Sequence, residues 1–307
     1  MARRYFVYVA FLLLLGFFAV TLQDDGFLSQ TNLLNIVRQT TPVTVMAVAV
    51  VFVLSAGEID LSIGAVVALS ALVTAEVMRS DGALLGVLAG LGVGVAVGAL
   101  NGAFVTLLRL PSFLVTLAAM GIVAGLARMV TDLESVAVED QSFIDLFGSG
   151  DVGPIPGLAF WALGAVGAGH FVFRHTRFGA HVVATGDDAG AARVSGIRVE
   201  RVKFAVLMLS GAAAALAGIL YTGRVEAASY TLGEQDLLTV IAAVVIGGTR
   251  LFGGEGSVVG ALVGSLIMGM LTNGLILSGL SAAEQTTAQG LLLLLAISLT
   301  LREPREA

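Results

Sequence analysis

The chain has 307 residues, of which 57% are hydrophobic and only 12% charged, with a formal net charge of −6 and a mean hydropathy of +0.97. A soluble domain carries about 25% charged residues, so this composition excludes a soluble enzyme, a nucleic-acid-binding protein and a disordered chain. Cysteine is absent, which excludes a disulfide, a thiolate metal site and a thiol nucleophile. We therefore expect a single polytopic all-α membrane domain over residues 1–307.

Apolar stretches predict ten transmembrane helices, because a helix that crosses the bilayer needs about 20 apolar residues. The first stretch lacks a signal-peptide cleavage pattern and is predicted to be a retained helix. The ten stretches cover residues 5–22, 42–56, 61–78, 83–108, 112–130, 157–174, 203–221, 237–249, 257–278 and 287–301.

The charged residues predict that both termini lie in the cytoplasm. With ten spans, both termini lie on the same side of the membrane, and twelve of the 16 Lys and Arg residues lie on that side, including Arg302 and Arg305. Cytoplasmic segments of membrane proteins carry the excess of basic residues. Most acidic residues, including Asp236, fall on the opposite side. Residues 131–156 then form an extracytoplasmic loop with six carboxylates, and residues 174–202 form a cytoplasmic loop.

Glycine recurs every four residues along the fourth stretch, which leaves one helix face nearly free of side chains and favours close packing of another helix. The segment 98–102 has a looser counterpart at 269–274, five helices further on. A duplication with that odd offset would give two inverted five-helix halves; chance similarity of two glycine-rich helices is the alternative. The packing candidates are Gly86, Gly90, Gly94, Gly98 and Gly102.

Two carboxylates follow the second stretch, in a setting where ionisable groups usually face a cavity or a partner. Asp60 and Ser62 are candidates for capping the next helix, and Glu58 is a candidate for lining a translocation path. Asn101 and Asn273 are candidates either for bonds between helices or for contact with a hydroxylated solute.

The cytoplasmic loop contains an alanine-rich run that predicts a helix of about two turns within residues 187–197. Asp187 or Asp188 can cap its N-terminus, and Gly196 can end it. This helix is too short to span the membrane.

A second polar region, near the inner end of the eighth stretch, is rich in glycine and suits a gating loop, since glycine adopts positive φ without strain. It lacks the glycine, lysine and Ser/Thr order of a phosphate-binding loop, so no nucleotide site is predicted in this chain. No catalytic set and no metal-ligand set is predicted either. The gating candidates are Gly247, Gly248, Gly253, Gly254 and Gly256.

Three sequence blocks resemble the ribose, xylose and galactose type of ABC importer permeases. Residues 57–64 read GEIDLSIG, and residues 191–197 read AARVSGI, followed by RVK at 201–203. Residues 242–249 read AAVVIGGT, followed by GGEGSV at 253–258. The blocks stand in the order found in that family.

The resemblance implies a permease subunit in the plasma membrane that translocates a monosaccharide or similar small polyol. It implies pairing with a second copy or a paralogue, an extracytoplasmic sugar-binding protein outside, and a pair of ATPase subunits inside that hold ATP and Mg²⁺. The short cytoplasmic helix would be the coupling helix, although Gly190 stands where the wider importer pattern has Glu. The implied coupling residues are Asp187, Asp188, Ala191, Ala192, Arg193, Ser195, Gly196 and Ile197.

Other transport functions stay open at this point. An ion-coupled secondary transporter would need membrane-embedded acids, for which Glu58 and Asp60 are the only good candidates. An ABC permease for a nucleoside or a branched-chain amino acid is the other alternative, and it would carry different residues at positions 57–64.

Overall fold

The computed structural model describes residues 2–301, which are mainly helical; the predicted cytoplasmic tail with Arg302 and Arg305 lies outside them. Two small antiparallel ladders pair β1 with β4 and β2 with β3. The elements in chain order are α1 (Ala2–Thr21), α2 (Gln30–Ser55), α3 (Ile63–Asp81), α4 (Ala83–Leu107), α5 (Ser112–Val130), β1 (Val136–Ala137), α6 (Gln141–Phe147), β2 (Asp151–Val152), β3 (Ile155–Pro156), α7 (Gly157–His175), α8 (Arg177–Asp187), α9 (Ala189–Val194), α10 (Val199–Val225), β4 (Ala227–Ala228), α11 (Asp236–Ile246), α12 (Val258–Leu277) and α13 (Ala282–Leu301).

Six helices in the described part of the chain are long and apolar enough to cross a membrane, namely α2, α3, α4, α5, α10 and α12. The protein is therefore a polytopic helical membrane protein. The predicted stretch at 237–249 corresponds to α11, whose 11 residues rise only about 16 Å at 1.5 Å per residue. That is roughly half of the 30 Å hydrocarbon core, so the count of ten full spans stays a prediction.

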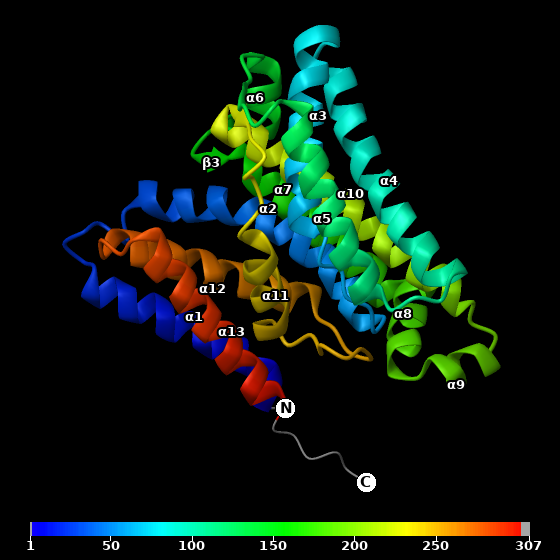
Figure 1. Cartoon of the computed structure of the whole chain (residues 1–307). Helices are drawn as coiled ribbons and strands as arrows, with labels where there is room; N and C mark the ends of the chain where they lie inside the picture. The colour runs from blue at the N-terminus through cyan, green and yellow to red at the C-terminus, as the bar shows by residue number, and fades with distance from the viewer. Residues whose placement is uncertain (1, 302–307) are drawn as a thin grey trace.

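Helices α2 and α10 lie between two groups of helices (Figure 1), with α3 to α5 on one side and α11 to α13 on the other. The contacts on the two sides correspond. Helix α10 packs on α3 and α4, and α2 packs on α11 and α12; α3 contacts α4 and α5, and α11 contacts α12 and α13. Helices α3 and α11 run in opposite directions (Figure 1). This arrangement is what two inverted halves would produce, while α1 and α7 stand outside the correspondence.

Glycines explain how closely these helices approach. A Cβ added at Gly86 would lie 2.6 Å from the carbonyl oxygen of Thr74 on α3, and one added at Gly98 would lie 2.6 Å from that of Leu207 on α10. The glycine face of α4 thus packs against α3 near one end of the helix and against α10 near the other end. In the second group, a Cβ added at Gly264 of α12 would collide with the carbonyl of Ala243 on α11.

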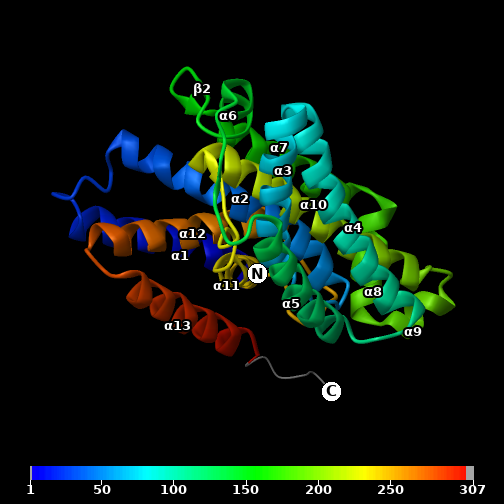
Figure 2. The ribbon, with the colours of Figure 1, turned by 45° about the horizontal axis from the view of Figure 1, so that its top comes forward.

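The two long polar segments lie at opposite ends of the molecule (Figure 2), which we call the α6 end and the α9 end. At the α6 end, β1 from the acidic loop pairs with β4, which follows α10. The guanidinium of Arg38 on α2 bonds the carboxylate of Asp151 at 2.8 Å. The acidic loop is therefore tied to the helices beneath it.

Candidate functional site

The segment between α2 and α3 is not helical, and α5 satisfies its backbone. Gly57 has a φ of +77° and turns the chain after α2. The amides of Ile59 and Leu61 donate to the hydroxyls of Ser112 and Thr116, each at 3.0 Å. Irregular backbone at membrane depth needs such protein partners because no water replaces them, so Ser112 and Thr116 of α5 hold the segment in place.

Asp60 is buried and fully engaged within this segment. Its Oδ1 accepts hydrogen bonds from the Ser62 amide at 2.9 Å and the Ser62 hydroxyl at 2.6 Å. Asn101 of α4 donates to the same hydroxyl at 3.0 Å. Ser62 precedes α3 but its side chain makes no capping bond. The carboxylate of Asp60 thus binds the backbone at the start of the helix, and Asn101 links this turn to α4.

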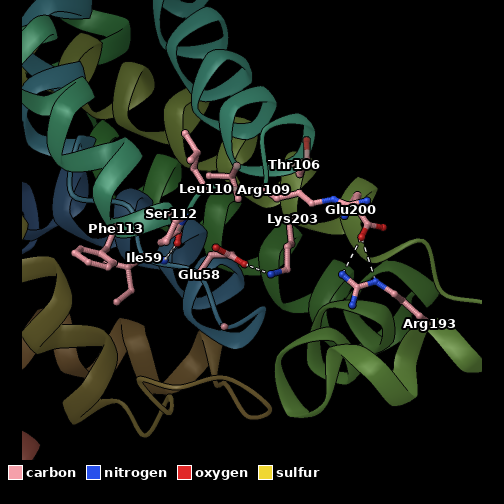
Figure 3. Close-up of a pocket in the computed structure, with 13 residues that line it drawn as sticks. Glu58, Ile59, Thr106, Arg109, Leu110, Ser112, Phe113, Arg193, Glu200 and Lys203 are labelled. Atoms are coloured by element: carbon pink, nitrogen blue, oxygen red, sulfur yellow. Dashed lines mark hydrogen bonds and ion pairs between the residues drawn. The ribbon is translucent and has the colours of Figure 1, made fainter.

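Glu58 forms an ion pair with Lys203 of α10, the only lysine in the chain. The Glu58 side chain is 5% exposed and that of Lys203 is 26% exposed. Both lie in a cavity of about 680 Å³ at the α9 end (Figure 3), with Arg109, Arg193 and Glu200 also in its wall. The sequence alone did not identify a partner for Glu58. The one feature that could have pointed to it is that Lys203, four residues after the start of α10, is the only lysine in the chain.

The short helix predicted within residues 187–197 is present as α9, with Gly196 at a φ of +86° just after it, but a second helix, α8, precedes it and was not predicted. The hydroxyl of Thr176 accepts from the Gly179 amide at 3.4 Å and starts α8, an 11-residue helix that the sequence analysis missed. Asp188 then interrupts the helical backbone with a φ of −151° and caps α9, which has only six residues. The capping residue is Asp188, while Asp187 ends α8.

The small residues of α9 do not form one exposed face. Ala192 is 4% exposed and packs into the permease itself, whereas Ala191, Ser195 and Gly196 are exposed. Val194 is 91% exposed, and the sequence analysis did not select it. Val194 lies three residues after Ala191, and residues at this spacing share one face of a helix. This spacing could have identified Val194 from the sequence.

α9 is linked to α10 by an ion pair and by the short turn between the two helices. The Arg193 guanidinium bonds the Glu200 carboxylate at 2.8 Å (Figure 3), and the Ile197 amide bonds the Ala192 carbonyl at 3.0 Å. Asp188 accepts from the amides of Ala191 and Gly190, and these two bonds lower the pKa of its carboxyl. The Arg193–Glu200 pair thus connects α9 to the first turn of α10, and Lys203, which pairs with Glu58, follows in the next turn.

The glycine-rich loop at 247–256 packs against α8 and the end of α2. A Cβ added at Gly253 would lie 2.5 Å from the carbonyl oxygen of Gly186, and one at Gly254 would lie 3.0 Å from the Asp187 carboxylate. The Gly254 amide donates to the Ser55 carbonyl at 3.1 Å. Two further gating candidates serve the same close packing, since Gly256 lies against α2 and Gly247 lies against α12. Gly248 does not: a Cβ added there would meet nothing within 4 Å, and its φ of +89° is what favours glycine.

Asn273 does not join this site. Its side-chain amide exchanges two hydrogen bonds of 2.9 Å with that of Asn32, which connects α12 to α2. Asn101, by contrast, belongs to the Asp60 turn. The structure thus groups Glu58, Asp60, Ser62 and Asn101, and separates Asn273 from them.

A permease family model, described as branched-chain amino acid transport system / permease component, matches residues 32–299. The chain belongs to this permease family. It is 37% identical to the ribose import permease protein RbsC of Escherichia coli strain K12, over 96% of this chain and 95% of that protein.

The permease is also 33% identical to the L-arabinose ABC transporter permease protein AraH of Azospirillum brasilense, over 95% of this chain and 85% of that protein. It is 32% identical to the xylose transport system permease protein XylH of Escherichia coli strain K12, over 95% of this chain and 90% of that protein. No solved structure matches the chain. The permease is accordingly a multi-pass protein of the cell membrane.

Proposed function

We propose that this permease is the membrane-spanning subunit of an ABC importer for a monosaccharide or similar small polyol. The observation that carries the proposal is the set of relatives named for ribose, L-arabinose and xylose, which match at least 95% of the chain. The chain would pair with a second permease subunit and receive its solute from an extracytoplasmic binding protein at the α6 end.

ATP would be hydrolysed on a separate pair of ATPase subunits that dock at the α9 end. The exposed face of α9 supports this role, since Ala191 and Ser195 are small and Val194 presents an uncovered apolar side chain. Exposed apolar groups rimmed by polar residues are typical of interaction surfaces. Arg198 and Arg201, also exposed, would meet acidic groups of the ATPase.

Coupling would then pass along a short chain of contacts. Arg193 and Glu200 transfer a movement of α9 to α10, and Lys203 transfers it to Glu58 in the turn before α3. The loop 247–256 joins α8 to the end of α2 on the other flank. Displacement of α9 by the ATPase would thus change the packing around the Asp60 turn. In this proposal, that turn closes the cytoplasmic end of the solute's path.

The test is uptake by the complete importer, reconstituted from permease, ATPase and binding protein in vesicles. Radiolabelled D-ribose, L-arabinose and D-xylose should accumulate only with ATP inside, and the permease alone should hydrolyse no ATP. Accumulation by the permease alone under a sodium or proton gradient would establish a secondary transporter instead. Accumulation of L-leucine but of none of the sugars would contradict the sugar assignment.

A further inference from the structure

A polar cavity of about 240 Å³ lies among α2, α10, α11, α12 and α13, next to the first turn of α11. Most of its wall consists of hydroxyl, amide and charged side chains, which are unusual so deep among membrane helices. Six of them are Gln39, Thr40, Arg224, Asp236, Thr239 and Thr272.

Asp236 provides the feature that points to a ligand. Its Oδ2 is buried, and among the described residues it has no hydrogen-bond partner. The Tyr221 hydroxyl bonds the carboxyl group and Arg224 lies near it, so the unpartnered atom is Oδ2 alone; the Arg224 guanidinium stands 5.2 Å from the centre of the Tyr221 ring. A buried acceptor without a partner is costly. A solute hydroxyl in the cavity would supply the missing donor.

The wall also restricts the chemistry of that solute. One carboxylate and one guanidinium leave the cavity without net charge, which disfavours anions and cations alike. Hydroxyl and amide side chains both donate and accept, as do the hydroxyls of a sugar. A branched aliphatic side chain would instead leave these groups unpaired, and sites built for hydrogen bonding reject such ligands strongly.

We propose that this cavity is the binding site of a neutral monosaccharide during its passage, with Asp236 accepting hydrogen bonds from the sugar hydroxyls. The inference rests on the proposed function and adds a site that none of the sequence motifs contains. Its place fits transport, because α11, with 11 residues, is too short to cross the membrane alone, and the cavity lies beside its first turn. Broken helices place solute sites at this depth in other transporters.

The first experiment measures uptake by the complete importer carrying Asp236→Asn. An amide in place of the carboxylate loses the charge-assisted bonds, which predicts at least a roughly tenfold loss of D-ribose, L-arabinose and D-xylose uptake below saturation. Glu234→Gln is the matched control, since Glu234 is exposed and lies two residues away outside the cavity wall. Unchanged uptake of all three sugars by the Asp236→Asn importer would overturn the proposal.

The second experiment does not depend on how well that variant transports. Because the chain has no cysteine, Thr239→Cys puts a single thiol in the cavity wall, and Ser80→Cys puts one on an exposed turn. A transported sugar should slow labelling of the first thiol by a small methanethiosulfonate reagent severalfold, but not labelling of the second, and L-leucine should slow neither.

The two proposals fail in different ways. If the wild-type importer accumulates a sugar and that sugar leaves the Thr239→Cys thiol equally reactive, the site is wrong and the function stands. If the wild-type importer accumulates no sugar, the proposed function itself is wrong. Protection by L-leucine alone would assign the cavity to an amino acid.

Discussion

The starts of α3 and α11 occupy corresponding places in the two helix groups, yet their carboxylates differ. Asp60 receives two hydrogen bonds from Ser62 and is 6% exposed. Asp236 lies in the wall of a cavity; Tyr221 bonds its carboxyl group, but its buried Oδ2 has no hydrogen-bond partner among the described residues. The two starts touch, since a Cβ added at Gly64 would lie 2.5 Å from the carbonyl oxygen of Gly233.

The two helix groups share one packing arrangement, yet the region around Asp60 is closed and the region around Asp236 is open. Around Asp60, side chains of α4 and α5 fill the space and bond the backbone. Around Asp236, the corresponding space between α12 and α13 is a cavity, with Gln289 of α13 bonded to Thr272 of α12 at 3.0 Å across it. Transport would require each region to open and close in turn, and five variants disturb one region at a time.

The largest effect is expected from Lys203→Met, which leaves the buried Glu58 carboxylate without its partner. Removal of one member of a buried ion pair costs about 3–5 kcal/mol. The yield of assembled permease and its melting temperature in detergent should both fall sharply. The double variant with Glu58→Gln should recover most of the loss, and Arg201→Met, an exposed site on the same turn, should have little effect. A lone Lys203→Met as stable as wild type would mean that the pair does not hold the closed region.

Gly94→Leu should break the fit of α4 against α10. A Cβ at this position would collide with the Gly211 carbonyl, and overpacking costs roughly 1–3 kcal/mol or more. Gly92→Leu on the same helix is the control, because a Cβ there meets nothing within 4 Å. Thermal unfolding of the two purified variants should separate them clearly; equal melting temperatures would show that the first group tolerates looser packing.

Asp60→Ala and Asp236→Ala should separate the two helix starts by stability. The first removes the acceptor of two buried hydrogen bonds and should destabilise the permease by about 1–3 kcal/mol. The second removes one hydrogen bond, from Tyr221, together with an oxygen that has no partner among the described residues, so it should lower the melting temperature less than the first. Denaturant unfolding of both variants in the same micelle measures the difference, and the reverse order would refute the comparison.

The smallest effect is expected at α9, the helix on which the ATPase would act. Asp188 has a lowered pKa because two backbone amides bond its carboxylate. A carboxyl with a lowered folded-state pKa contributes stability above its usual pKa of about 3.9, and this is lost as the pH falls through the lowered value. Hydrogen exchange at the amides of Gly190 and Ala191 should therefore show constant protection from about pH 5 to pH 8. Protection that drops within that window would mean that the cap is not the charged carboxylate; Asp188→Ala should abolish it at every pH.

The sequence by itself determined the membrane class, most of the helix positions, the glycine face of α4 and the family. These features leave local traces, because a lipid environment demands long apolar runs and close helix packing demands small residues at a fixed spacing. The Asp60 turn was found for the same reason, since its carboxylates interrupt an apolar region.

The tertiary structure decided which polar groups meet. Glu58 and Lys203 are 145 residues apart, and Asn273 pairs with Asn32 across 241 residues. The alanine-rich run predicted α9, but α8 before it, which starts at the Thr176 side chain, was not predicted. Asp236 looked like one more extracytoplasmic acid, because the cavity at its carboxyl group forms only where four other helices meet α11. No local pattern records that convergence, and the open carboxylate at the start of α11 emerges only from the folded arrangement.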